Sequence, residues 1–137
     1  MNQLFAYHKL LKKIVFADEN LGELIRKYGH NLFNDFTAAQ KESMLSDFGN
    51  YASISVNGKP SYFFGYKIVD DEFYTGSLFQ CETQEGVNFN FVLESLEAFA
   101  KSKNCKTIVG QTARPALIGN LTGNGWKLSE IILRKTL

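Results

Sequence analysis

The stretch of this sequence best suited to chemistry lies between residues 74 and 103, where a predicted strand passes through a polar turn into a predicted helix. The turn reads Glu82-Thr-Gln-Glu-Gly-Val-Asn88. The first N–H groups of a helix have no partner within the helix, and the helix dipole adds partial positive charge beside them. A glycine-bearing turn that leads into a helix therefore predicts an anion site here.

The other reactive side chains are scattered. Cys81 and Cys105 are far apart, without Cys-x-x-Cys spacing and without a neighbouring histidine. This pattern is typical of buried free thiols in a reducing compartment and argues against a zinc site. His8 and His30 have no catalytic partner that the sequence identifies, so we expect both on the surface or in loops.

Composition indicates one ordinary globular domain, because the chain has 137 residues, with twelve Phe and six Tyr available for a core. Lys and Arg number 15 against 14 Asp and Glu, which gives no electrostatic reason to expect nucleic acid or an anionic membrane as a partner. The first residues lack a signal-peptide apolar region, and no apolar run approaches the ~20 residues that span a bilayer. We expect a soluble cytoplasmic protein.

The N-terminal part is predicted to be helical. Apolar residues recur at helical spacing over residues 3–16, although a strand over residues 13–16 is an alternative. Asp18 is expected to cap a second helix that stops at Gly29. A third helix is predicted over residues 37–49, ending at a glycine.

The hydrophobic period then changes to two. Strands are predicted over residues 51–56 and 59–69, on either side of Asn57-Gly58, the strongest short hairpin signal. Asp70-Asp71 forms another tight turn before a strand over residues 72–81. We expect these three strands to form an antiparallel meander.

The central unit is followed by a second strand and a helix. The helix over residues 89–103 precedes a buried strand over residues 107–111, and a crossover of this kind places that strand parallel to residues 72–81. Pro115 suits the first turn of a short helix. With a last strand over residues 126–137, the prediction is an α/β (α+β) fold with a mixed, mostly antiparallel sheet of about six strands flanked by helices.

This order of elements resembles the GNAT superfamily of acyl-CoA N-acyltransferases. The most specific part is Asn120-Leu-Thr-Gly-Asn-Gly-Trp126, which is similar to the short helix and glycine-aromatic turn that precede the last strand of the family. The resemblance covers residues 51–137. Residues 1–50 fit loosely, because the family usually begins with a strand before its paired helices. The resemblance implies a single GNAT-like domain over residues 1–137.

The loop that binds the cofactor pyrophosphate in the family follows the pattern Arg/Gln-x-x-Gly-x-Gly/Ala. Here Gln84 takes the first position, Gly86 comes two residues later instead of three, and no second glycine follows. Glu82 and Glu85 add negative charge where a diphosphate would lie. The sequence therefore resembles a divergent member of the family.

The end of the chain departs from the family as well. Counting back from Gly125, the usual Asn falls at Arg114 and the usual general-acid Tyr falls at Leu121. As a cation that opens a helix, Arg114 suits either a phosphate of coenzyme A or a surface salt bridge.

The resemblance implies transfer of an acyl group from acetyl-CoA or another acyl-CoA to an amine of a small molecule or peptide. Glu72 or Glu82 would be the base and Tyr74 the acid, with solvated carboxylates and a half-buried aromatic ring as the alternatives. Cys81 is either an acyl-accepting nucleophile or a buried thiol. The residues expected around the cofactor are Cys81, Gln84, Gly86, Val87, Asn88 and Arg114.

The alternative is a catalytically inactive GNAT-fold scaffold or interaction protein, because small members lacking the loop motif, which this sequence resembles, occur among bacteriophage virion and accessory proteins. Its partner would be a second copy or a virion component, and its location the virion. The strand Ser61-Tyr-Phe-Phe-Gly-Tyr66 has aromatic residues on both faces. Burial on both faces and an aromatic interaction surface are both consistent with that pattern.

Overall fold

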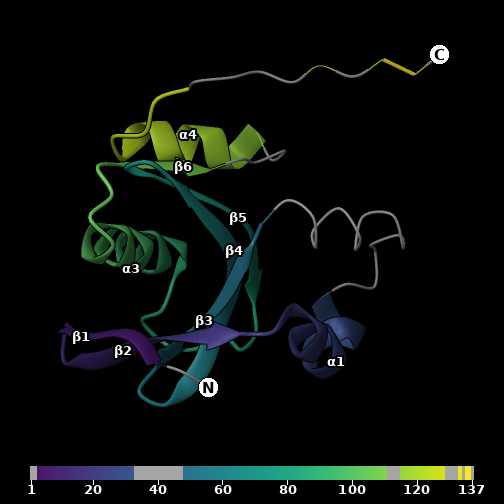
Figure 1. The fold of residues 1–137 in the computed structure, drawn as a ribbon, viewed down its shortest axis with the longest axis vertical. Coiled ribbons are helices and arrows are strands. Elements are labelled where there is room, and N and C mark those ends of the chain that lie inside the picture. Colours follow the sequence, from purple (N-terminus) through teal and green to yellow (C-terminus); the bar gives the residue numbers. More distant parts are fainter. Residues whose placement is uncertain (1–2, 33–47, 111–114, 129–132, 134, 137) are drawn as a thin grey trace.

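A computed structural model describes residues 3–32, 48–110, 115–128, 133 and 135–136. In this part of the chain a six-stranded sheet has the strand order β1-β2-β3-β4-β5-β6 (Figure 1). Neighbouring strands are antiparallel except β5 and β6, which are parallel. α1 lies on one side of the sheet and α3 on the other (Figure 1). The elements are β1 (Gln3–Lys9), β2 (Lys12–Glu19), α1 (Leu21–Leu32), β3 (Asn50–Val56), β4 (Lys59–Val69), β5 (Glu72–Gln80), α3 (Phe89–Ser102), β6 (Thr107–Gly110) and α4 (Pro115–Gly123).

The chain begins with a hairpin, so the predicted helix over residues 3–16 is wrong. Leu10 and Leu11 form the turn between β1 and β2, with φ angles of 51° and 63°. β2 also pairs with β3 along its length, from Ile14 opposite Val56 to Glu19 opposite Tyr51. Hydrogen bonding to a strand distant in sequence overrides the local helical spacing. The alternative strand over residues 13–16 lies inside β2.

α1 begins two residues later than predicted. The Oδ1 atom of Asn20 accepts the backbone N–H of Glu23 at 3.2 Å, so Asn20 provides the cap. Asp18 cannot do so because it belongs to β2. The helix also continues beyond Gly29 to residue 32. Of the helix predicted over residues 37–49, the last two residues are described and are not helical, and the rest lies outside the described residues.

The three-strand meander is confirmed, with each strand end within one residue of its prediction. Asn57 and Gly58 have φ angles of 52° and 82°, as a type I′ hairpin turn requires. The Asn57 side chain also accepts the N–H of Lys13 at 2.9 Å, which ties this turn to β2. Asp70 makes the next turn with a φ angle of 55°.

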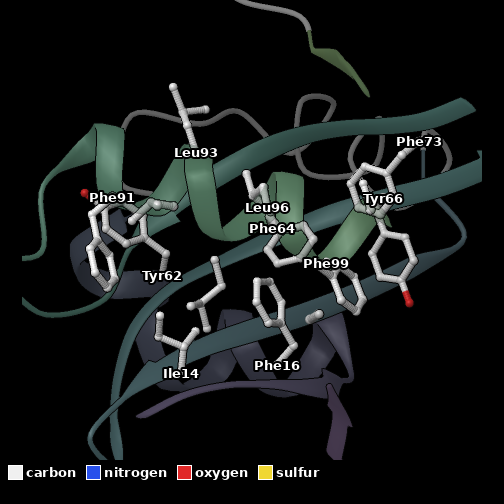
Figure 2. Packing of buried hydrophobic residues seen from close by; sticks show 14 of the residues in the cluster. Ile14, Phe16, Tyr62, Phe64, Tyr66, Phe73, Phe91, Leu93, Leu96 and Phe99 are labelled. Atoms are coloured by element: carbon white, nitrogen blue, oxygen red, sulfur yellow. The ribbon is translucent and has the colours of Figure 1, made fainter. Parts of the chain in front are cut away.

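The core fills the space between the sheet and α3 (Figure 2). Phe99 lies at its centre: its ring stacks on Phe16 with 4.5 Å between centroids and meets Phe64, Tyr66 and Phe73 nearly at right angles. Edge-to-face and stacked arrangements of this kind add to the stabilisation from buried aromatic area. α3 is thereby held against the sheet, which positions the loop before it.

The aromatic residues of β4 are buried on both faces of the sheet. Tyr62, Phe64 and Tyr66 point towards α3 (Figure 2), whereas Phe63 alternates to the other face and is 1% exposed. The prediction of an aromatic interaction surface on this strand is therefore wrong, and the alternative prediction, burial on both faces, is confirmed. The inactive-scaffold alternative thereby loses its proposed aromatic interaction surface, although the incomplete loop motif that also suggested it is unaffected. An oligomer or virion partner stays a prediction.

The C-terminal part matches the prediction as far as α4. Asn104 ends the α3 segment with a φ angle of 62°, and β6 is parallel to β5. The described residues of the predicted strand over residues 126–137 form no strand. The N–H of Trp126 instead bonds back to the Leu121 carbonyl at 3.1 Å, which closes the end of α4. The remaining residues of that prediction lie outside the described residues.

Candidate functional site

β5 leads into the loop before α3. Its described pairing with β6 runs from Glu72 opposite Thr107 to Thr75 opposite Gly110. β5 itself continues to Gln80, where the loop begins.

A bulge lies near the end of β5, between Gly76 and Phe79. Phe63 is opposite Phe79 and Gly65 is opposite Gly76, so three residue steps on β5 face two on β4. The ring of Phe48 covers the glycine pair, because a Cβ atom at Gly76 would lie 2.6 Å from it. Packing thus restricts this position to glycine and holds the bulge in place.

The loop over residues 81–88 connects β5 to α3. Gly86 adopts a left-handed conformation with a φ angle of 76°, and the N–H of Val87 bonds to the Gln84 carbonyl at 3.2 Å. Asn88 caps α3, because its Oδ1 atom accepts the N–H of Phe91 at 2.9 Å. The predicted strand, glycine turn and helix are therefore present. Val87 is buried and its N–H is bonded within the loop, while the Asn88 side chain is engaged in the helix cap, so contact of either residue with a cofactor stays a prediction.

Gln84 points inward. Its side-chain oxygen accepts a hydrogen bond from the Ser61 hydroxyl, and its side-chain nitrogen donates to the Val56 carbonyl at 3.3 Å. Both polar ends of the side chain are therefore engaged by the protein. Direct contact between Gln84 and a cofactor stays a prediction, and its observed partners belong to the β3–β4 hairpin.

The loop has a cationic neighbour that sequence reasoning missed. The Nζ atom of Lys12 lies 3.2 Å from the position that a Cβ atom at Gly86 would take. Lys12 makes no ion pair with a described residue, whereas Glu82 and Glu85 are exposed on the loop. The ammonium group offsets part of their negative charge. No local signal pointed to Lys12, because the β1–β2 hairpin was itself mispredicted.

Two of the predicted catalytic residues form a pair at the beginning of β5. The hydroxyl of Tyr74 donates to Oε2 of Glu72 at 2.6 Å, and Nζ of Lys67 lies 5.5 Å from the centre of the Tyr74 ring. Both members of the pair are half-buried. Glu82 is not part of it, because it follows the other end of the strand, roughly 30 Å away at 3.3 Å per residue.

The two cysteines differ. Cys105 is buried as predicted, and burial together with the negative charge of Asp71 raises the pKa of its thiol. Cys81 is half-buried beside the loop, where its N–H bonds to the Ser61 carbonyl at 2.7 Å. Arg114 lies outside the described residues. Within the described ranges, no group of three or more His, Cys, Asp or Glu side chains is placed to hold a metal.

A hollow of about 480 Å³ lies apart from this site, where α1 begins. Asp18, Glu19 and Phe48 are among its lining residues, and none of the predicted site residues lines it. Glu19 is already engaged there by the Ser53 hydroxyl at 2.9 Å. The hollow is therefore separate from the loop and from the Glu72–Tyr74 pair. No helix in the described ranges is long and apolar enough to cross a membrane.

No protein-family model and no curated protein matches this chain. Solved structures do. The aminoglycoside N-acetyltransferase AAC(6')-Iy, in complex with a CoA bisubstrate analogue, is 14% identical with a TM-score of 0.52, covering 90% of this chain and 98% of the other. Ribosomal-protein-alanine N-acetyltransferase from Brucella melitensis biovar Abortus 2308 is 13% identical with a TM-score of 0.52, covering 90% and 99%.

The chain has the fold of the GNAT N-acyltransferases, as predicted. Identities this low define the fold and not the activity. A transcriptional regulator from Bacillus halodurans C-125 makes the same point, since it matches with a TM-score of 0.54 at 13% identity, covering 90% of this chain and 99% of the other.

Proposed function

We propose that this protein is an acyl-CoA-dependent N-acyltransferase that transfers an acyl group, such as acetyl, to an amine. The observation that carries the proposal is the glycine turn at Gly86, which leads from β5 into the N-terminal end of α3 and has the Lys12 ammonium group beside it.

The loop between β5 and α3 supplies the groups that would bind the diphosphate of the cofactor. Its backbone N–H groups between Gly86 and Asn90 lead into the positive end of the α3 dipole, and Lys12 brings a cation to the same turn. A diphosphate suits this combination of amides and ammonium group. Cys81, Val87 and Asn88 belong to the site through the loop backbone, and Arg114 is expected to add a second cation.

The Glu72–Tyr74 pair supplies acid-base chemistry. Bound acyl-CoA provides the acyl group as a thioester. An attacking amine must lose a proton, and the Glu72 carboxylate is the acceptor in this proposal. The Tyr74 hydroxyl donates to the same carboxylate, which orients it. In this proposal Tyr74 is also the acid that protonates the leaving thiolate of coenzyme A. Glu72 is preferred over Glu82 as the base, because the Glu72 carboxylate is half-buried and oriented by Tyr74, whereas Glu82 is exposed.

Titration with acetyl-CoA tests the proposal. A ligand that binds the native state stabilises it by RT ln(1 + [L]/Kd), about 2.7 kcal/mol at a hundredfold excess over Kd. We expect a rise in melting temperature that increases with acetyl-CoA concentration, together with acetyl-CoA-dependent modification of a panel of amines. An unchanged melting temperature at millimolar acetyl-CoA would overturn the proposal.

A further inference from the structure

The loop between β5 and α3 has an anchor in the β3–β4 hairpin. We propose that Gln84 is a positioning residue, which holds residues 81–88 in the conformation that presents their backbone to an anion, and that Ser61 is its anchor. This inference rests on the proposed function. In this inference the Gln84 side chain acts on the loop, and the predicted direct contact with the cofactor is the competing hypothesis.

Ser61 is placed for this role by a bulge in β4. Ile54 is opposite Tyr62 and Ser55 is opposite Pro60, so Ser61 is the additional residue on β4. It is completely buried. A bulge turns backbone groups away from the neighbouring strand, which leaves them available to another segment.

Ser61 binds the loop through both its backbone carbonyl and its side chain. Its carbonyl accepts the N–H groups of Cys81 at 2.7 Å and Glu82 at 3.5 Å, and its hydroxyl donates to the side chain of Gln84. The backbone contacts fix where the loop leaves β5. The side-chain contact fixes the loop three residues after Cys81, at Gln84, which is two residues before Gly86.

Gln84 completes the connection. Its side-chain nitrogen donates to the carbonyl of Val56, the last residue of β3, and its own carbonyl accepts the N–H of Val87. The site thus requires one acceptor for a hydroxyl and one donor for a carbonyl on the same side chain. An amide provides both, whereas a carboxylate or a thioether provides no donor.

Anchoring matters because the loop has a single glycine turn and carries two exposed carboxylates. A loop that samples many conformations binds its ligand more weakly, since apparent Kd rises as the competent fraction falls. Holding the loop in one conformation removes part of that cost before binding. The partly buried hydrogen bonds of Gln84 thereby act on the affinity for the ligand, although the Gln84 side chain does not contact it.

The test compares Gln84→Met, Ser61→Ala and the double variant in the full chain. Each single variant is expected to weaken acetyl-CoA binding about tenfold, as a fall of the competent fraction to about one tenth predicts. The double variant should be no weaker than Gln84→Met alone, because the contact that Ser61→Ala removes is already lost in Gln84→Met. In the absence of cofactor, amide hydrogen exchange across residues 81–88 should be faster in both single variants than in the wild-type protein.

Gln80→Ala is the matched control, because Gln80 is an exposed glutamine whose side chain bonds only to the neighbouring Thr83 hydroxyl in the described contacts, at 3.5 Å.

Two results would overturn the inference. If Gln84→Met weakens binding and Ser61→Ala does not, Gln84 contacts the cofactor directly. Unchanged exchange across the loop in both single variants would remove the anchor. If the wild-type protein fails to bind acetyl-CoA, the proposed function is refuted instead. Hydrogen exchange across residues 81–88 then tests by itself whether Gln84 positions the loop. Gln84→Met leaves buried Ser61 intact, so the test survives if Ser61→Ala does not fold.

Discussion

The two ends of β5 differ in how they present polar groups. At its beginning, Glu72 and Tyr74 offer side chains that are half-buried and bonded to each other. At its end, the loop offers mainly backbone, while its Gln84 side chain is turned inward. Side chains are suited to moving protons and backbone amides to holding an anion. The proposed function therefore assigns chemistry to the beginning of β5 and anion binding to its end.

The largest effect that would test this division is expected at Gly86. Gly86→Val should abolish stabilisation by acetyl-CoA, because a β-branched residue disfavours the positive φ angle of 76° and its side chain would displace Lys12. Gly58→Val is the matched control, since Gly58 has a φ angle of 82° and open space around it. Differential scanning fluorimetry with acetyl-CoA measures both. Retained stabilisation in Gly86→Val would place the anion site elsewhere.

A second prediction concerns the beginning of β5. Glu72→Gln should lower kcat about a hundredfold or more, the usual contribution of a general base, with the affinity for acetyl-CoA unchanged. Steady-state kinetics with an amine acceptor, together with calorimetric titration, separates the two quantities. Glu82→Gln serves as the comparison. If Glu82→Gln lowers kcat and Glu72→Gln does not, the two ends of β5 have been assigned the wrong way round.

A third prediction concerns Lys12, which the structure adds to the loop end. Lys12→Met should weaken acetyl-CoA binding about fivefold, since a partly exposed ion pair contributes about 1 kcal/mol. The difference from wild type should shrink as salt rises. Lys13→Met, one residue further along β2, is the control because Lys13 is exposed and its backbone faces the Asn57 turn. Equal effects of the two substitutions would indicate a general charge effect rather than a site contact.

The smallest expected effect is at Asn88. Asn88→Ala removes the cap of α3 and should lower the free energy of unfolding by about 1 kcal/mol, measured by urea denaturation. Asn88→Ser retains a capping oxygen and should restore most of the loss. Because the cap orients the first amides of α3, a modest fall in acetyl-CoA affinity should follow in Asn88→Ala. Full affinity in that variant would mean that the loop amides, and not the helix end, hold the anion.

Turn chemistry explains which parts of the fold were predictable. Asn57-Gly58, Asp70 and Asn104 each mark a chain reversal or a helix end at the predicted place, because the residues themselves favour positive φ angles. The β1–β2 turn gave no such signal, since it is made by Leu10 and Leu11, which rarely adopt these angles. The first hairpin was consequently read as a helix.

The sequence by itself determined the strand, loop and helix from β5 to α3, with Gly86 at the turn and Asn88 at the helix start. These features depend on residues close together in the chain. Tertiary structure alone decided that Lys12 lies beside Gly86 and that Gln84 is bound to Ser61 and Val56. Those contacts join segments distant in sequence, and they exist because the paired strands and the packed helix bring the segments together. Patterns among residues close together in the sequence therefore do not predict such contacts.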